Sequence, residues 1–358
     1  TYPVEPTRVE ATPEMIEILA GHMHTKPDEA STVAEATEEL GTDAGLKLVD
    51  MKDVPYADET WDAFIGQMTL DEMLLMLDDS QGNSAAVIER LGIPAMSLGD
   101  GVNGPNGCTL PFPYTADEGS IYGSGTVENA RMACFAGKPI LTGTFNRDLY
   151  KERGRLIGEM GLWADKQEFW TLGTNLHRTP FGGRNFEYCS EDANMCYMVL
   201  IPEAKEIEKR GVIVCAKHPA GNDQETARIG VSVFFNEQAW REGSLRASEG
   251  ALREAGIHAF MQSYERLGLR STMNSSAFNQ TVVQDEWGFR GNIITDCTNG
   301  KLDGYQGDYI DQLAAGTDRF CMTNGTVAMD AVKKYLDETD DGDFVQYIKR
   351  AAKNYCYE

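Results

Sequence analysis

The sequence lacks any apolar run of the roughly 20 residues that a membrane-spanning helix requires. Its first residues also lack a basic segment followed by an apolar one, which is the pattern of a secretory signal. We therefore expect no membrane partner and a cytoplasmic location. Because the chain starts at Thr1 without Met, we also expect it to be a fragment of a longer protein.

Motifs for metals, nucleotides and nucleophilic serines are absent as well. Only 5 His residues are present, and neither H-x-x-x-H nor a cluster of Cys and His occurs, so no metal site is expected. The chain has no G-x-x-x-x-G-K-[ST] motif and no G-x-S-x-G turn. We therefore expect no cofactor.

The 8 cysteines are scattered and form no C-x-x-C pair. Several of them lie in apolar runs, where a thiol behaves as a small hydrophobic side chain. We expect free thiols in a reducing compartment.

Positive charge is scarce. Lys and Arg number 32 against 56 Asp and Glu, which gives a formal charge of -24. Such a chain repels nucleic acid and anionic lipid, and it favours neutral or cationic ligands. Nucleic acid is therefore not an expected partner.

Organised structure is predicted to begin near residue 61. Residues 1–60 are acidic and loosely patterned, and we interpret them as a linker or collar. Thr69, with Glu72 three residues later, has the capping-box pattern of a helix start and is followed by apolar residues at helical spacing. A chain of 358 residues suits one barrel or two ordinary domains. We predict one catalytic barrel domain over residues 61–358.

Short apolar runs alternate with longer amphipathic stretches through this domain. The stretches 147–163 and 236–255 carry a helical period, which suits repeated βα units around a parallel sheet. The apolar runs lie at 95–98, 140–142, 169–172, 212–215, 257–261, 292–295 and 319–322. They are one short of a (β/α)8 TIM-like barrel, whose missing member would be a degraded first strand near residues 80–90. An open, doubly wound sheet is the alternative.

Polar residues follow these runs, each at the exit of a predicted strand. They are Asp100, Arg178, Lys217 with His218, Tyr264 and Asp296. A barrel gathers its strand exits at one face, so residues far apart in the sequence converge on one pocket. An open sheet would spread them along a crevice. This pattern favours an α/β fold of the barrel type.

Asp296 is the candidate nucleophile. A carboxylate at the mouth of a barrel can attack an anomeric carbon and form a covalent intermediate, although an Asp that caps the next helix is the alternative. Lys217 and His218 would grip sugar hydroxyls and keep a neighbouring carboxylate ionised, with a structural role as the alternative for His218. Tyr264 would hold the nucleophile by its hydroxyl.

The polar stretch 175–192 would form a binding wall. In it, Arg178 is the expected ligand of a polar substrate, whereas Arg184 and Glu187 are expected to pair with each other and brace the loop. Asp100 lies in a Gly-rich segment, where it would either chelate two sugar hydroxyls or fill a turn.

Together these segments resemble glycoside hydrolase family 3, the β-glucosidase family. The resemblance runs from about Leu48 to Tyr355 and rests on Leu-Gly-Asp-Gly at 98–101, the stretch 175–192, Ala-Lys-His-Pro-Ala-Gly-Asn-Asp-Gln-Glu-Thr at 216–226, Asp-Glu-Trp-Gly-Phe-Arg-Gly at 285–291 and Thr-Asp at 295–296. It implies a (β/α)8-like barrel that removes single β-linked sugars from non-reducing ends with retention. It also implies that Asp296 is the nucleophile and that Asp100, Arg178, Lys217, His218 and Tyr264 hold the sugar in the first subsite.

The chain also departs from the family's pattern. Cys297 follows Asp296 where an aromatic residue is common, and Pro219 replaces a usual Phe. In β-glucosidases of the family, the general acid/base is a Glu on a separate α/β sandwich domain, which comes first in members with inverted domain order. This chain has no such domain, so we expect the Glu to come from an α/β sandwich domain or chain elsewhere.

The expected function follows from the resemblance. It is a retaining, exo-acting β-glycosidase that hydrolyses terminal non-reducing β-D-glycosyl residues of oligosaccharides or glycosides through a covalent glycosyl-Asp296 intermediate. General acid catalysis is worth about 10²- to 10⁴-fold, so the chain alone should act poorly on activated aryl glycosides and hardly at all on alkyl glycosides. The alternatives are a non-catalytic carbohydrate-binding barrel or one chain of a split glycosidase. A β-N-acetylhexosaminidase is the weaker option, because that branch supplies its acid from a His that residues 225–231 lack.

Overall fold

The structure of the protein is a computed structural model. It describes residues 10–17, 40–80, 83–84, 86–105, 109–110, 114–116, 125–127, 130–131, 133–298, 308–323, 325–339, 341 and 344–358. Residues 1–9 and 18–39 of the expected linker therefore lie outside the described residues. Within 40–60, Met51 is buried and Leu46, Leu48 and Val54 pack against the core, so folded structure reaches back before residue 61.

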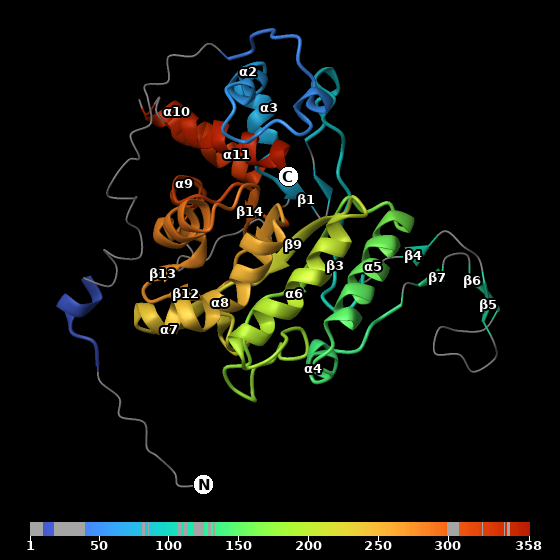
Figure 1. Ribbon diagram of the computed structural model, residues 1–358. Helices are drawn as coiled ribbons and strands as arrows, with labels where there is room; N and C mark the ends of the chain where they lie inside the picture. The colour runs from blue at the N-terminus through green and yellow to red at the C-terminus, as the bar shows by residue number, and fades with distance from the viewer. Residues whose placement is uncertain are drawn as a thin grey trace.

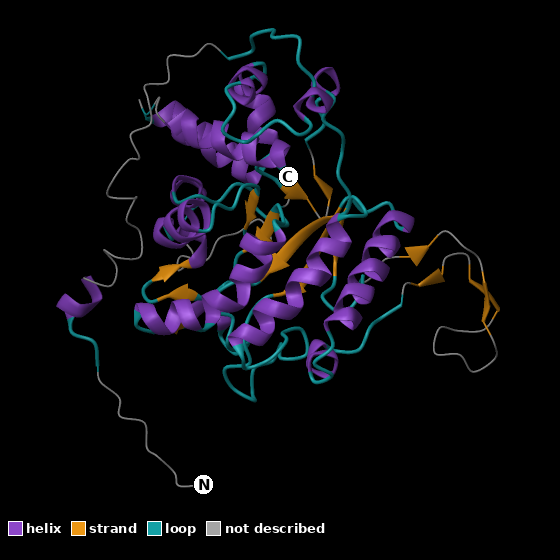
Figure 2. Ribbon diagram, in the orientation of Figure 1, coloured by secondary structure: helices purple, strands orange, loops and turns teal. Residues whose placement is uncertain are grey.

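A parallel sheet of five strands forms the centre of the molecule (Figure 2). In chain order the strands are β3 (Leu98–Asp100), β8 (Glu168–Gly173), β9 (Ile213–Lys217), β11 (Ala259–Met261) and β14 (Asn292–Ile294). Every neighbouring pair is parallel, in the order β14-β11-β9-β8-β3. Helical segments connect successive strands, and parallel strands require such crossovers, so the fold is α/β as expected.

Two further segments extend this sheet beyond β14. Arg319 bridges to Ile294 and Phe320 bridges to Asp78, and both bridges are parallel. Among the described residues, no strand pairing joins the Asp78 segment to β3. The structure therefore shows a parallel α/β sheet without showing a closed eight-stranded barrel.

Three of the expected strands take another form. The run 140–142 lies in the helix α4 (Lys138–Thr142), because Pro139 occupies its first turn, where the fixed φ of proline suits a helix. Near residues 80–90 the chain forms an antiparallel pair, β1 (Asp79–Ser80) and β2 (Asn83–Ser84), rather than a parallel strand. The run 319–322 contributes only single bridges.

Helices α5 (Arg147–Trp163), α6 (Ala193–Glu208) and α8 (Ser244–Glu249) lie side by side across one face of the sheet (Figure 1). α5 has the bounds that the sequence predicts. The predicted helix 236–255 is divided into α7 (Glu237–Glu242), α8 and a π-helical turn (Gly250–Ala255). At Gly154 an added Cβ would lie 2.3 Å from the carbonyl oxygen of Glu203, so glycine permits the close approach of α5 and α6.

A second group of helices contributes to a separate hydrophobic cluster. The group consists of α2 (Thr60–Gly66), α3 (Leu70–Leu75), α9 (Tyr309–Ala314), α10 (Val327–Glu338) and α11 (Val345–Tyr357). The capping box at the start of α3 is confirmed, since Thr69 accepts from the backbone of Glu72 and Glu72 accepts from that of Thr69. No helix that the structure describes combines the length and the apolar character needed to cross a bilayer.

Alternate residues of the strands feed two hydrophobic clusters, as the period of a β-strand requires. Phe169, Val214, Phe260 and Ile293 face α5, α6 and α8. Their neighbours Trp170, Cys215, Met261 and Ile294 face the other way and join the cluster that includes α2, α3, α10 and α11. The strands are thus buried on both faces, which is typical of a parallel sheet.

A buried ionic cluster connects the first group of helices to a loop at the sheet. Glu203 on α6 is fully buried and accepts from Lys138 Nζ of α4 at 2.9 Å and from Arg153 Nη1 of α5 at 2.7 Å. Arg153 Nη2 also donates to the carbonyl oxygen of Val102 at 2.5 Å, in the loop that follows β3. A buried charge needs such partners, so these elements are held as one set.

Short elements complete the described chain. The remaining strands are β4 (Thr109–Leu110), β5 (Tyr114–Ala116), β6 (Gly125–Val127), β7 (Ala130–Arg131), β10 (Ser232–Val233), β12 (Arg266–Leu267) and β13 (Arg270–Ser271). 3₁₀ turns span Leu48–Met51, Glu89–Leu91, Arg228–Gly230 and Thr272–Asn274, and a π-helix spans Ala277–Glu286.

Candidate active site

A cavity of about 550 Å³ opens at the carboxyl ends of the parallel strands. Most of its lining comes from the five strands or from residues just beyond them. The lining residues are Leu98, Gly99, Asp100, Trp170, Arg184, Lys217, His218, Arg228, Met261, Tyr264, Asp296, Cys297 and Met322. Ligands of α/β proteins bind at this end of the strands, so the cavity is the candidate active site.

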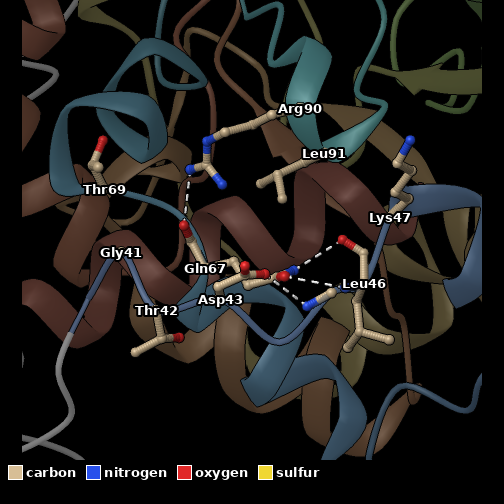
Figure 3. A pocket seen from close by; sticks show the side chains of 10 residues that line it. Gly41, Thr42, Asp43, Leu46, Lys47, Gln67, Thr69, Arg90 and Leu91 are labelled. Atoms are coloured by element: carbon tan, nitrogen blue, oxygen red, sulfur yellow. Dashed lines mark hydrogen bonds between the residues drawn. The ribbon is translucent and has the colours of Figure 1, made fainter.

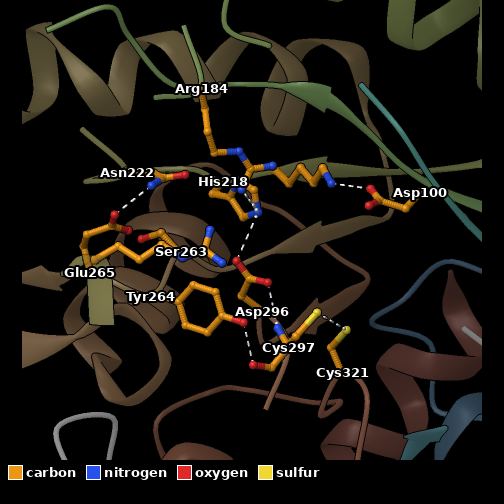
Figure 4. A network of polar contacts seen from close by, with 12 residues as sticks. Asp100, Arg184, His218, Asn222, Ser263, Tyr264, Glu265, Asp296, Cys297 and Cys321 are labelled. Carbon is orange, nitrogen blue, oxygen red and sulfur yellow. Dashed lines mark hydrogen bonds and ion pairs between the residues drawn. The ribbon is translucent and has the colours of Figure 1, made fainter. Parts of the chain in front are cut away.

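Asp296 lies two residues beyond β14 and is almost fully buried. Its Oδ1 accepts from the backbone N–H of Cys297 at 2.7 Å, and its Oδ2 lies 3.2 Å from Nε2 of His218 (Figure 4). Burial by itself raises the pKa of Asp296, but the contact with His218, the N–H of Cys297 and the charge of Lys217 outweigh burial. The net pKa lies well below the usual value, so the group is a carboxylate at neutral pH.

His218 is buried beneath the cavity. Burial and the nearby Arg184 guanidinium lower the pKa of His218 to about 3, so the imidazole is neutral at pH 7. Its support for Asp296 is therefore a hydrogen bond rather than a charge. The lasting positive charges beside the carboxylate are Lys217 and Arg184, whose Nη1 lies 3.3 Å from His218 Nε2.

Asp100 and Lys217 form an ion pair across the cavity, between the ends of β3 and β9. The Lys217 side chain is 6% exposed, whereas that of Asp100 is 48% exposed. Asp100 therefore keeps acceptor capacity toward the cavity while Lys217 fixes its position. A half-exposed, anchored carboxylate can accept from two neighbouring hydroxyls of a ligand.

Tyr264 lies beyond the end of β11 and donates its hydroxyl to the carbonyl oxygen of Cys297 at 2.5 Å. Burial, followed by the charge of Asp296, raises the pKa of Tyr264, so the phenol keeps its proton. The guanidinium of Arg228 lies 4.5 Å from the centre of its ring. The sequence predicts that Tyr264 bonds the Asp296 carboxylate directly. In the structure its hydroxyl instead bonds Cys297, the residue that follows the nucleophile.

A chain of buried polar groups leads from His218 through Tyr188 and Asn222 to Glu265, and Figure 4 shows its last contact, between Asn222 and Glu265. Nδ1 of His218 lies 3.2 Å from the hydroxyl of Tyr188, which donates to Oδ1 of Asn222 at 2.5 Å. Asn222 Nδ2 donates to Oε1 of Glu265 at 2.7 Å. Burial raises the pKa of Glu265 to about 8, so this group is largely protonated at neutral pH.

A second cavity, of about 560 Å³, lies between residues 41–47 and the start of α3 (Figure 3). Several of its polar groups are bonded to one another or to the backbone. Gln67 Oε1 accepts from the N–H groups of Ala44 and Leu46, and Arg90 pairs with Glu72. It lacks the buried, ionised carboxylate that Asp296 supplies to the first cavity. We therefore centre the active site on the strand ends.

No family model matches the chain. Curated relatives do match it: a β-glucosidase of Rhizobium radiobacter is 28% identical over 235 residues, 66% of this chain and 27% of the relative. Beta-glucosidase BoGH3A of Bacteroides ovatus is 29% identical over 233 residues, 65% of this chain and 30% of the relative. The solved structure of β-glucosidase 3B from Thermotoga neapolitana in complex with glucose superposes with a TM-score of 0.69 at 25% identity, over 83% of this chain and 42% of that one. The chain is a homologue of the family 3 β-glucosidases.

These relatives are much longer than the chain. The chain spans about a third or less of the curated β-glucosidases that it matches first. A β-glucosidase structure from Paenibacillus barengoltzii, 24% identical, covers 98% of the chain with a TM-score of 0.70 and supports the fold.

The structure of this chain brings together five of the predicted site residues. Asp100, Lys217, His218, Tyr264 and Asp296 all line the cavity, although they come from four different strand ends. The rule that parallel strands present their exits at one edge is therefore sufficient to group them.

The two arginines of the stretch 175–192 differ from expectation. Arg178 does not line the cavity: its Nη1 pairs with Asp223 at 2.8 Å and its guanidinium lies 3.9 Å from the centre of the Phe235 ring. Arg184 pairs with Glu187, as the bracing prediction states, and it also lines the cavity beside His218. The arginine of this loop that can reach a ligand in the cavity is therefore Arg184.

Three other residues that line the cavity are not predicted from the sequence. Trp170 was interpreted only as part of an apolar run, yet the alternation of β8 turns it toward the cavity. Met322 ends the run 319–322, so the strand-exit rule could have included it. Arg228 lies in a loop with no such signal. No group of three or more His, Cys, Asp or Glu side chains in the described chain could hold a metal ion.

Proposed function

We propose that the chain is the nucleophile-bearing part of a retaining, exo-acting β-glycosidase. Its substrates would be β-glycosides, hydrolysed at the terminal non-reducing β-D-glycosyl residue through a covalent glycosyl-Asp296 intermediate. The observation that carries this proposal is the buried, ionised Asp296 in a cavity that also presents Asp100, Lys217 and Arg184. The β-glucosidase names of the relatives agree with it.

On this proposal each group has a task. Asp296 attacks the anomeric carbon, forming a carbon–oxygen bond to the carboxylate while the bond to the leaving group breaks. The N–H of Cys297 occupies one lone pair of Oδ1 and fixes the carboxylate. Asp100 and Arg184 are placed to bond the sugar hydroxyls, and their partners Lys217 and Glu187 hold them in position.

The proton for the leaving group is proposed to come from outside these residues. Among the described residues that line the cavity, Asp100 and Asp296 are the carboxylates, and Asp100 is committed to Lys217. We assign the acid/base to a Glu of an α/β sandwich domain or chain, as the resemblance implies. A general acid contributes about 10²- to 10⁴-fold, so leaving groups that need no proton are the suitable substrates for this chain alone.

On the same proposal, residues 61–358 form the catalytic domain and its sheet closes as a (β/α)8 barrel. The parallel bridges of Arg319 and Phe320 continue the sheet in the direction that closure requires. The convergence of five strand ends on one cavity also supports a barrel.

A fluorosugar labelling experiment tests the nucleophile. Incubation with 2,4-dinitrophenyl 2-deoxy-2-fluoro-β-D-glucoside should add one fluoroglucosyl group to the protein, and peptide mapping should locate it on Asp296. The dinitrophenolate leaves without a proton, so the missing acid does not limit labelling. Asp296→Asn serves as the matched control and should remain unlabelled.

The outcome also separates the alternative. Glucoside binding by calorimetry with no adduct would support a non-catalytic carbohydrate-binding protein and contradict the proposal. An adduct on a residue other than Asp296 would contradict the assignment of the nucleophile.

A further inference from the structure

Three sulfur atoms gather at the wall of the cavity, next to Asp296. Cys297 Sγ lies 3.8 Å from Cys321 Sγ and 3.1 Å from Met322 Sδ. Cys297 and Met322 line the cavity, and Figure 4 shows Cys297 and Cys321 turned toward each other beneath Asp296. We call these three residues the sulfur cluster.

Backbone contacts hold the sulfur cluster together. Cys321 donates its N–H to Thr295 Oγ1 at 3.0 Å, and its carbonyl oxygen accepts from the N–H of Thr298 at 2.9 Å. These bonds lie on either side of Cys297 in the sequence, so they fix it against Cys321. The cluster therefore belongs to the scaffold of the sheet rather than to a loose surface loop.

The cluster occupies a position where the family resemblance leads one to expect an aromatic ring. A thiol at residue 297 replaces an inert ring with a ligating atom that faces the cavity. Both Cys297 and Cys321 are free thiols.

The donor set selects the class of ligand. Thiol and thioether sulfurs are soft donors that suit Cu(I) and similar ions, whereas Mg²⁺ and Ca²⁺ require oxygen ligands. With metal–sulfur bonds of about 2.3 Å, a trigonal site separates its sulfurs by about 4 Å. The spacing of Cys297 and Cys321, 3.8 Å, is close to this value. Met322 Sδ lies 3.1 Å from Cys297 Sγ and would move outward by about 1 Å on binding, which the flexible Met side chain permits. Zn²⁺ fits less well, because structural Zn²⁺ sites use four ligands and a thioether is not among the usual donors to Zn²⁺.

We propose that Cys297, Cys321 and Met322 form a binding site for one soft monovalent cation, such as Cu(I) or Ag(I), at the wall of the active-site cavity. On binding, one thiol releases its proton to solvent and forms a metal–thiolate bond, while the other thiol and the thioether donate as neutral ligands. The charge of the ion and that of the thiolate cancel, which suits a position beside Asp296.

Occupation of the site would be transmitted to the nucleophile. The N–H of Cys297 holds Asp296, and its carbonyl oxygen holds Tyr264. A metal bond to Sγ restrains the same residue and narrows the cavity. Bound cation should therefore inhibit both glycoside binding and glycosyl transfer to Asp296.

Cation binding can be measured without any enzymatic activity. Copper(I) is titrated into the full chain in the presence of a chromophoric bidentate Cu(I) chelator. The chelator withholds the ion from single thiols, so only a site with several sulfur ligands can take it. The wild-type chain should take one equivalent from the chelator. Cys321→Ser should weaken this binding by about 100-fold or more and Met322→Leu by about tenfold, because each removes one soft donor. Circular dichroism verifies that the variants fold.

A matched control comes from the other close pair of buried cysteines. Cys196→Ser alters the pair of Cys189 and Cys196, which lies away from the cavity, and should leave Cu(I) affinity unchanged. Unchanged affinity in both Cys321→Ser and Cys297→Ser, or loss of the tight site in Cys196→Ser, would overturn the proposal. Failure of fluorosugar labelling would overturn the proposed glycosidase function and leave the cation result standing.

Discussion

Replacing Glu265 by Gln should make the native state more stable at alkaline pH. Glu265 is fully buried, its Oε1 accepts from Asn222, and its Oε2 has no hydrogen-bond partner. Burial raises its pKa from 4.5 to about 8, so the native state holds a proton that the unfolded state releases above pH 4.5. Stability is therefore lost as the pH rises through this window, and a neutral glutamine removes the loss.

The size of the effect follows from the two pKa values. Each pH unit between them changes the free energy of unfolding by about 1.4 kcal/mol. The wild type should lose about 3 kcal/mol between pH 4.5 and pH 7, and about 4 kcal/mol by pH 8, where the native carboxyl is itself half ionised. Below pH 4.5 both states are protonated, so the term vanishes there.

Urea unfolding followed by circular dichroism at pH 5 and at pH 8 measures the difference. The stability of Glu265→Gln relative to wild type should rise by several kcal/mol between the two pH values, about 4 by the same arithmetic. Glu237→Gln, whose side chain is 80% exposed, serves as the control and should show no such rise. An equal difference between Glu265→Gln and wild type at both pH values would refute the reasoning.

Four further substitutions test the fold and the cavity. Thr69→Ala removes the cap of α3 and should lower the free energy of unfolding by about 1 kcal/mol in urea; no change would mean that the cap is dispensable. Tyr264→Phe leaves a carbonyl beside the nucleophile without its donor, which at about 1–3 kcal/mol corresponds to a fall of roughly 5- to 150-fold in the rate of fluorosugar labelling, and an unchanged rate would contradict this. Arg184→Met should weaken glucoside binding by at least about tenfold in calorimetry, since it removes a charged donor. Arg178→Met should leave binding within about twofold, and the reverse order would restore Arg178 as the ligand.

The elements that the sequence predicts well are those decided by local patterns. The helical period of residues 147–163 gives the bounds of α5, and the capping box of Thr69 and Glu72 marks the start of α3. The prediction of a strand at 140–142 is wrong because a run of three residues carries no period, and Pro139 favours a helix there. Closure of the sheet depends on pairings between distant segments, which no local pattern specifies.

For the candidate site, the strand-exit rule places Asp100, Lys217, His218, Tyr264 and Asp296 in one cavity. The rule works because it depends only on parallel strand order. It could not choose between two arginines of one loop, since their directions are set by distant partners such as Asp223.

It also overlooked a buried residue beside the site. Glu265 follows Tyr264 directly, yet it bonds Asn222 behind the cavity, and the sequence gives no indication of that separation.

The buried cluster of Glu203, Lys138 and Arg153 has a consequence for building hybrid proteins from related sequences. Each partner comes from a different helix, and Arg153 also bonds Val102 in the loop that follows Asp100. Exchanging α6 alone would introduce a helix whose neighbours still carry two buried cations. Crossover points within residues 138–203 would therefore separate charges that must be inherited together. Segments exchanged between homologues should begin before α4 and end after α6, so that the loop that follows Asp100 keeps its support.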